Sequence, residues 1–239
     1  MKTAISTACF YLKEETENAL SLIKETGAAA CSVHLQTFYE YRPEFAKKYA
    51  QNLGGVEVCS VEVGAQNYEP QLFSPSRRIR GDGFYWLEQV MRSCQLLGAK
   101  RYILKAPPQA TDENFEDRLQ YLRGISEFCQ SCGIGLCIEN SPTGLLDSPT
   151  KIAKIKSVCP EICFSLNLKG ATIPPGSLQT CLKETAGSLA QVVVDKDTDL
   201  NKLIKLLKKA AFDGEIIVNE QNFTKISQLK DIIDKVNLI

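Results

Sequence analysis

Short apolar runs alternate along the chain with longer stretches in which apolar residues recur at helical spacing. The runs predicted to be strands are Thr3–Phe10, Ala29–Leu35, Val56–Val63, Arg101–Lys105, Gly135–Glu139, Ile162–Leu166, Leu189–Asp195 and Glu215–Asn219. The predicted helices are Glu15–Glu25, Pro43–Leu53, Phe84–Leu97, Asp112–Cys132, Ser148–Val158, Ser177–Thr185, Leu200–Ala211 and Thr224–Val236. The segment Gly64–Gly83 is predicted to be a long polar loop, which we expect to contact substrate.

This alternation predicts a parallel sheet, because parallel neighbours need a crossover and crossovers are usually helical. Eight units of about 30 residues in 239 favour a closed (β/α)8 TIM barrel of class α/β. An open doubly wound sheet is the alternative, but no glycine-rich phosphate-binding turn follows the first run, where Phe10 leads into Tyr11 and Leu12. No linker divides the chain, so we predict a single domain over residues 1–239.

The charge balance excludes some partners. With 28 Lys and Arg against 28 Asp and Glu, the net charge of zero offers no attraction to nucleic acid or to an anionic membrane. Four lysines on one amphipathic helix are predicted to form a solvated face: Lys202, Lys205, Lys208 and Lys209. No apolar run approaches the roughly 20 residues of a membrane span, and the amino terminus does not resemble a signal peptide. We therefore expect a cytoplasmic location; the sequence leaves the oligomeric state open.

The ten cysteines are spread over the chain, and most stand within apolar runs, where a thiol packs as a small hydrophobic group. Cys129 and Cys132 have the spacing of a redox motif. That pair ends a predicted helix, whereas a reactive thiol is favoured at a helix start. No second pair follows at the spacing of a zinc site, so a structural role is favoured.

Candidate chemistry lies where the predicted strands end, because the active face of a (β/α)8 barrel is formed by the carboxyl ends of its strands. The side chains at these ends are His34, Glu62, Lys105, Glu139, Asn140, Asn167, Lys169, Asp195, Asn219 and Glu220. A buried charge is costly unless it is paired, so we expect Lys105 to neutralise Glu62 and Glu139. His34 is the only histidine; an acid/base role and a structural role both remain open, with the structural one favoured.

Several motifs, in the right order over nearly the whole chain, resemble the sugar phosphate isomerase/epimerase family. They are Ile5–Phe10, Leu35–Phe45, Tyr68–Ser74, Leu97–Lys100, Ile138–Asn140, Phe212–Ile217 and Asn222–Phe223. That family belongs to the xylose-isomerase-like TIM barrels, which also include endonuclease IV. The resemblance implies a divalent metal at the barrel mouth, held by Glu, Asp and His, together with an acid/base group that moves a proton between neighbouring carbons.

This chain departs from the family pattern at most of those positions. Glu139 is kept, but Glu62 and Lys105 stand where the family has His, and Asn167 stands where it has Asp. The seventh strand brings no His before Asp195, and the eighth aligns Asn219 with a family Glu, although Glu220 follows directly. An ammonium near Glu139 would take the place and charge of the ion, so a metal such as Mn or Zn is disfavoured and we expect no cofactor.

Two functions follow. The first is an isomerase or epimerase acting on a small carbohydrate or sugar phosphate, with Glu139 and Lys105 as acid/base pair and Glu62 and Glu220 as second candidates. His34, Asn167, Lys169, Asp195 and Asn219 would then bind substrate, and a cluster formed by Arg77, Arg78 and Arg80 would suit a phosphate, although a solvated turn is the favoured reading. The second is a non-catalytic relative that binds a carbohydrate-like ligand or a protein partner. Endonuclease activity is a distant third, because that chemistry is expected to need a His-rich metal cluster.

Overall fold

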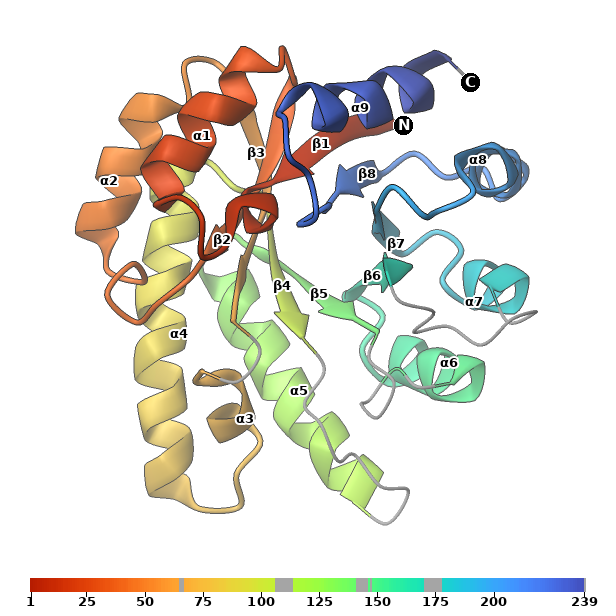
Figure 1. Cartoon of the computed structure of the whole chain (residues 1–239). Coiled ribbons are helices and arrows are strands. Elements are labelled where there is room, and N and C mark those ends of the chain that lie inside the picture. Colours follow the sequence, from red (N-terminus) through yellow and green to blue (C-terminus); the bar gives the residue numbers. More distant parts are fainter. Residues whose placement is uncertain (65–66, 106–113, 141–145, 147, 170–177, 239) are drawn as a thin grey trace.

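A computed structural model shows eight parallel strands that close into a barrel, with helices around the outside (Figure 1). It describes residues 1–64, 67–105, 114–140, 146, 148–169 and 178–238. The strands are β1 (Lys2–Ser6), β2 (Ala30–Leu35), β3 (Glu57–Val63), β4 (Arg101–Lys105), β5 (Gly135–Glu139), β6 (Cys163–Asn167), β7 (Leu189–Val194) and β8 (Glu215–Val218). Strand order follows chain order, which confirms the predicted (β/α)8 barrel.

The helices follow the strands as predicted, with one addition after β3. They are α1 (Thr16–Glu25), α2 (Pro43–Asn52), α3 (Glu69–Leu72), α4 (Arg77–Leu97), α5 (Phe115–Ser131), α6 (Pro149–Val158), α7 (Leu178–Glu184), α8 (Leu200–Lys209) and α9 (Ser227–Leu238). A 3₁₀ helix, η1 (Thr7–Phe10), follows β1. Among the described residues, no helix is long and apolar enough to cross a membrane.

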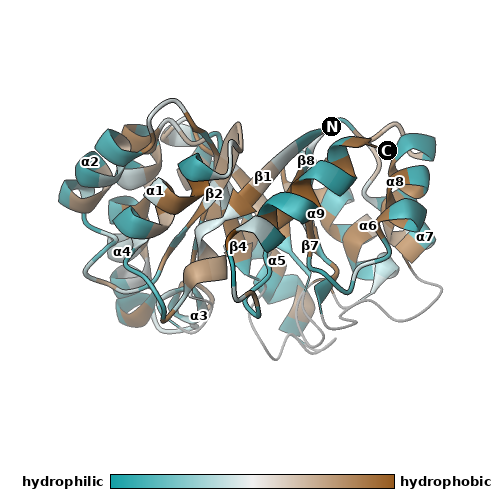
Figure 2. Ribbon diagram, turned by 45° about the horizontal axis from the view of Figure 1, so that its top comes forward, coloured by the Kyte–Doolittle hydropathy of each residue, from teal (hydrophilic) through white to brown (hydrophobic). Residues whose placement is uncertain are grey.

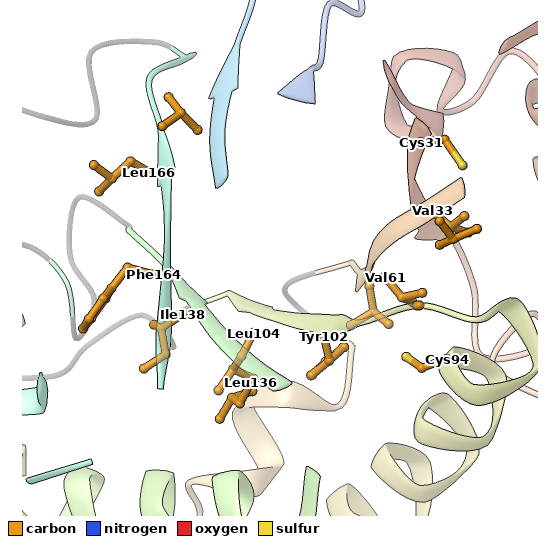
Figure 3. Close-up of a cluster of buried hydrophobic side chains, with 14 of the residues drawn as sticks. Cys31, Val33, Val61, Cys94, Tyr102, Leu104, Leu136, Ile138, Phe164 and Leu166 are labelled. Atoms are coloured by element: carbon orange, nitrogen blue, oxygen red, sulfur yellow. The ribbon is translucent and has the colours of Figure 1, made fainter. Parts of the chain in front are cut away.

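Successive side chains along each strand point to opposite faces, so one set lies inside the barrel and the other packs against the helices. On β2, Cys31, Val33 and Leu35 belong to the large core between strands and helices, whereas Ala30 belongs to a small separate cluster inside the barrel. Figure 3 shows outward-facing side chains of several strands packed in that large core, together with Cys94 of α4. Eight of the ten cysteines are buried and Cys132 and Cys163 are half-buried, as expected of thiols that serve as packing groups.

The helices bury one side against this core and expose the other, which Figure 2 shows as brown and teal faces of the same ribbon. In α8, Leu203, Ile204 and Leu207 are buried. The four lysines of that helix are exposed, as predicted from their spacing.

Two predicted segments are wrong. The first strand ends at Ser6 rather than Phe10, because the Ser6 hydroxyl accepts the Ala8 N–H at 3.1 Å and caps η1. The predicted loop Gly64–Gly83 contains α3 and the first two turns of α4. At Gly83 an added Cβ would lie 3.0 Å from the Leu72 nitrogen, so the glycine allows α4 to approach α3 closely. Residues 65–66 of this segment lie outside the described part.

Closure of the barrel depends on a close approach at Gly214, just before β8. The Gly214 carbonyl accepts the Lys2 N–H at 3.1 Å, and a Cβ at this position would lie 2.1 Å from the Ala190 carbonyl oxygen. We expect Gly214→Ala to push β8 away from β7 and to lower the free energy of unfolding by about 1–3 kcal/mol, measured by urea denaturation.

Gly124→Ala is the matched control, because Gly124 lies inside α5 and nothing lies within 4 Å of its added Cβ. This variant should gain about 0.5–1 kcal/mol from helix propensity. Equal stability of Gly214→Ala and the unmodified protein would show that the β7–β8 contact does not constrain the barrel.

Candidate active site at the barrel mouth

Three charged side chains meet where β3, β4 and β5 end. The Lys105 Nζ lies 3.1 Å from Glu62 Oε2, so the predicted pairing of these two residues is present. Lys105 and Glu139 are partners in the β4–β5 register, although no ion pair joins them among the described contacts. On the other side of Glu62, its register partner His34 places Nδ1 3.5 Å from Glu62 Oε1. His34 and Glu62 are register partners, as are Lys105 and Glu139, whereas Lys105 lies two residues beyond Ile103, the register partner of Glu62. The four side chains therefore come from four neighbouring strands at the mouth.

The two carboxyl groups differ in their tendency to bind a proton. Burial opposes the charge of Glu62, but the Lys105 ammonium and His34 outweigh it and hold the pKa of Glu62 well below its usual range. Burial dominates at Glu139 and raises its pKa, although Lys105, Asn167 and Ser165 act in the opposite sense. The carboxylates raise the pKa of Lys105 despite its burial, so this ammonium stays charged. Glu62 is thus held as an anion, whereas Glu139 binds a proton more readily than Glu62 does.

A layer of hydroxyl and amide groups inside the barrel supports these carboxyl groups. Ser165 Oγ donates to Glu139 Oε2 at 3.3 Å and accepts from Gln191 Nε2 at 3.0 Å. Gln191 Oε1 accepts from Ser60 Oγ of β3 at 3.0 Å, so this side chain spans the barrel interior from β6 to β3. Ser6 Oγ lies 3.4 Å from Glu62 Oε1. Because these groups are buried, the network fixes the carboxyl positions.

At the end of β6, Asn167 connects Glu139 with Lys169. Its Nδ2 donates to Glu139 Oε1 at 3.2 Å, and its Oδ1 accepts the Lys169 N–H at 3.0 Å. The Asn140 Oδ1 in turn accepts the Asn167 N–H at 2.5 Å. Lys169 extends across the mouth and donates from Nζ to Asn219 Oδ1, beyond the end of β8, at 3.2 Å.

A pocket of about 500 Å³ opens above these groups. Its described lining is Ala8, Tyr11, His34, Gln36, Gly64, Asn67, Lys105, Asn167, Lys169, Asn219 and Gln221. Five predicted site residues, His34, Lys105, Asn167, Lys169 and Asn219, therefore share one pocket. Glu62 and Glu139, which expose only 6% each, lie at its floor beside Lys105 and Asn167.

Two predicted site residues are engaged elsewhere. Asp195 Oδ1 accepts hydrogen bonds from the Thr198 hydroxyl at 2.9 Å and from the Asp197 N–H at 3.1 Å. The Glu220 carboxylate accepts the N–H groups of Asn222 at 2.5 Å and Lys196 at 3.2 Å. Neither residue lines the pocket; both shape the loops that follow β7 and β8.

The arginine cluster also lies away from the pocket lining. Arg80 is part of α4, and its Nη1 donates to the carbonyls of Ser74 at 2.6 Å and Pro75 at 2.9 Å. Its guanidinium lies 4.8 Å from the Tyr121 ring centroid. Arg80 therefore fastens the start of α4, while Arg77 and Arg78 are exposed on the same helix.

Sequence reasoning missed a buried acid next to Lys105. Glu69, on α3, is fully buried, and its Oε1 accepts a hydrogen bond from the Tyr102 hydroxyl at 2.5 Å. Tyr68 donates to the Tyr102 oxygen at 2.8 Å. Burial raises the pKa of Glu69 to about 8, against the opposing effects of Tyr102 and Lys105. Its motif, Tyr68-Glu69-Pro70, supported the family resemblance, but its place in a predicted loop concealed the burial.

The residues at the mouth do not fit the divalent ion that this barrel class implies. An ammonium lies against Glu62, and amides occupy the ends of β6 and β8, where carboxylates would be needed. The Glu139 oxygens accept hydrogen bonds from Asn167 and Ser165. No group of three or more His, Cys, Asp or Glu residues in the described part is placed to hold a metal.

Known structures with the same fold include sugar epimerases. The D-psicose 3-epimerase of Clostridium cellulolyticum H10 is 12% identical, with a TM-score of 0.82 over 100% of this chain and 99% of the other. The 3-keto-D-glucoside 4-epimerase of E. coli is 12% identical, with a TM-score of 0.76 over all of both chains. A family 2 AP endonuclease of Brucella melitensis is 12% identical, with a TM-score of 0.77 over 98% of each chain.

These neighbours agree with the resemblance drawn from the sequence, and at such identities they establish the fold alone. No protein-family model and no curated protein sequence matches the chain.

The ion pair at the mouth can be tested by stability. Lys105→Met should lower the free energy of unfolding by about 3 kcal/mol, because it leaves the buried Glu62 carboxylate without its cation. Lys105→Met combined with Glu62→Gln should recover most of this loss in chemical denaturation. Additive losses in the double variant would show that the two side chains are not coupled.

Glu69 predicts a pH dependence. Its pKa of about 8 in the fold lies above that of an unfolded glutamate, so its stabilising contribution is complete at low pH and declines as pH rises from about 5 to 8. Glu69→Gln removes this titration. We expect the variant to melt about 2–4 °C above the unmodified protein at pH 8.5, with a smaller or reversed difference at pH 5. A difference that is the same at both pH values would contradict the assignment.

Proposed function

We propose that the barrel mouth catalyses proton transfer next to the carbonyl of a small polyhydroxylated compound, as in the isomerisation or epimerisation of a carbohydrate, without a metal ion. The observation that carries this proposal is the placement of Glu139 beside Lys105, on the neighbouring strand, at the pocket floor. One is a carboxyl group with a raised pKa, the other a permanent cation, and they are register partners on β4 and β5. Proton abstraction beside a carbonyl needs such a base and such a charge.

The reaction follows from these two groups. The Glu139 carboxylate removes the proton from the carbon next to the carbonyl, and the C–H electron pair moves into the forming carbon–carbon double bond. The carbonyl oxygen becomes an enolate oxygen, whose charge the Lys105 ammonium stabilises through a hydrogen bond. Protonation of the same carbon on its other face by solvent water, with Glu139 releasing its own proton to solvent, gives an epimer. Delivery of the proton to the former carbonyl carbon gives an isomer when the hydroxyl on the neighbouring carbon passes its proton to the enolate oxygen and itself becomes the new carbonyl.

The surrounding residues have supporting roles. Glu62 holds Lys105 at 3.1 Å, and Asn167 orients the carboxyl group of Glu139. Amide groups of the pocket wall suit sugar hydroxyls, which both donate and accept hydrogen bonds. Tyr11, whose ring packs edge-on against His34 at 5.7 Å, offers an apolar face at the pocket rim. The occurrence of epimerases among proteins of this fold supports the same class of substrate.

One observation favours a second function, ligand binding without turnover. Both oxygens of Glu139 and of Glu62 already have partners within the protein, among them Ser165, Asn167, Lys105 and Ser6. The network is therefore complete without substrate and could serve as a rigid floor under a bound ligand. The two functions differ in whether a carbon-bound proton exchanges with solvent.

The test is deuterium exchange from D₂O into a panel of keto-sugars and their phosphates, followed by NMR in the presence of a chelator. The unmodified protein should exchange the proton next to the carbonyl. Glu139→Gln should lose at least about 100-fold in rate while keeping affinity, because it removes the base but preserves shape. Glu161→Gln, an exposed substitution of the same type, is the control. Binding without exchange would select the binding function, and exchange that requires added metal would overturn the proposed chemistry.

A further inference from the structure

The charges on the pocket wall differ from those on its floor. The described lining contains two ammonium groups, Lys105 and Lys169, with amides, an imidazole and a phenol. No described lining residue is a carboxylate. The acidic groups Glu62 and Glu139 lie below, where hydrogen bonds from buried side chains hold them. A ligand entering the pocket therefore meets positive charge first.

Only one of the two lysines has a compensating acid within the described part of the chain. Lys105 pairs with Glu62 at 3.1 Å. Lys169 makes no ion pair with any described Asp or Glu; its Nζ contacts the amide oxygen of Asn219 at 3.2 Å. An ammonium has three donors, so this contact leaves capacity for a ligand. A half-buried cation without an acidic partner favours the entry of an anion.

The position of Lys169 is fixed relative to the proposed base. Asn167 accepts the backbone N–H of Lys169 with its Oδ1 and donates to Glu139 with its Nδ2. One side chain thus positions both the backbone of Lys169 and the carboxyl group of Glu139. A ligand bound to Lys169 would lie in the pocket of about 500 Å³, with its other end toward Glu139 and Lys105.

We propose that the ligand carries an anionic group, a phosphate or a carboxylate, which Lys169 binds together with Asn219. The substrate is then a phosphorylated or acidic sugar derivative rather than a neutral sugar. This inference rests on the proposed function for the identity of the remaining, polyhydroxylated part of the ligand. The anion site itself rests on the charge and geometry of the wall.

The experiment compares three keto-sugars that differ in charge: D-fructose, D-fructose 6-phosphate and 2-keto-D-gluconate. Calorimetry should show at least one of the two anions binding ten-fold or more tightly than fructose, and the preferred anion distinguishes phosphate from carboxylate. Lys169→Gln should weaken binding of that anion about ten-fold or more, and by a much larger factor than it weakens binding of fructose, because a charge-assisted hydrogen bond is lost. Lys202→Gln, on the exposed face of α8, is the charge-matched control and should change neither.

Equal binding of all three sugars, with no effect of Lys169→Gln, would overturn the anion site. Glu139-dependent exchange on fructose would in that case leave the proposed function standing. If no keto-sugar binds, inorganic phosphate is the probe. Phosphate that raises the melting temperature at constant ionic strength, and fails to do so in Lys169→Gln, supports the site independently of the proposed function. Stabilisation by phosphate that is unchanged in the variant overturns it.

Discussion

A half-buried positive charge determines what the mouth of this barrel can do. Lys105 stands at the end of β4 with its side chain 24% exposed, and anionic neighbours offset the cost of removing such a charge from water. Glu62 and Glu139 on the flanking strands provide them, and they in turn require the hydroxyl and amide groups beneath. The low pKa of Glu62 and part of the poor fit to a divalent ion follow from this ammonium group, whereas burial raises the pKa of Glu139.

Much of the fold was predictable because the apolar pattern within each βα unit agrees with the strand and helix that the unit forms. The bounds of β4 and β5 agree with the sequence pattern, since polar or glycine residues limit both apolar runs. The errors arose where tertiary contacts outweigh local preference. The residues after Ser6 have strand-forming side chains, yet a hydroxyl cap turns them into η1. The polar segment Gly64–Gly83 was predicted to be a loop, yet it contains α3 and the start of α4, where Gly83 allows close packing against α3.

The site was predictable to the extent that strand ends define it. Alternation along a strand fixes which side chains enter the mouth, and this brought His34, Lys105 and Asn167 into one pocket. Asp195 and Glu220 follow their strands, but their carboxylates accept hydrogen bonds from nearby backbone N–H groups. Position at a strand end does not show that such local hydrogen bonds replace an orientation toward the pocket. Glu69 could not be found by this reasoning, because its burial depends on how α3 packs against Tyr102.

A lysine at the mouth and a bound metal ion differ in how the positive charge reaches the site. A bound ion must be acquired after synthesis, can be lost by dilution and can be exchanged for a competitor. The ammonium of Lys105 is covalently part of the chain, so folding alone places one positive charge beside Glu62 in every molecule. The positive charge of Lys105 therefore needs no bound ion.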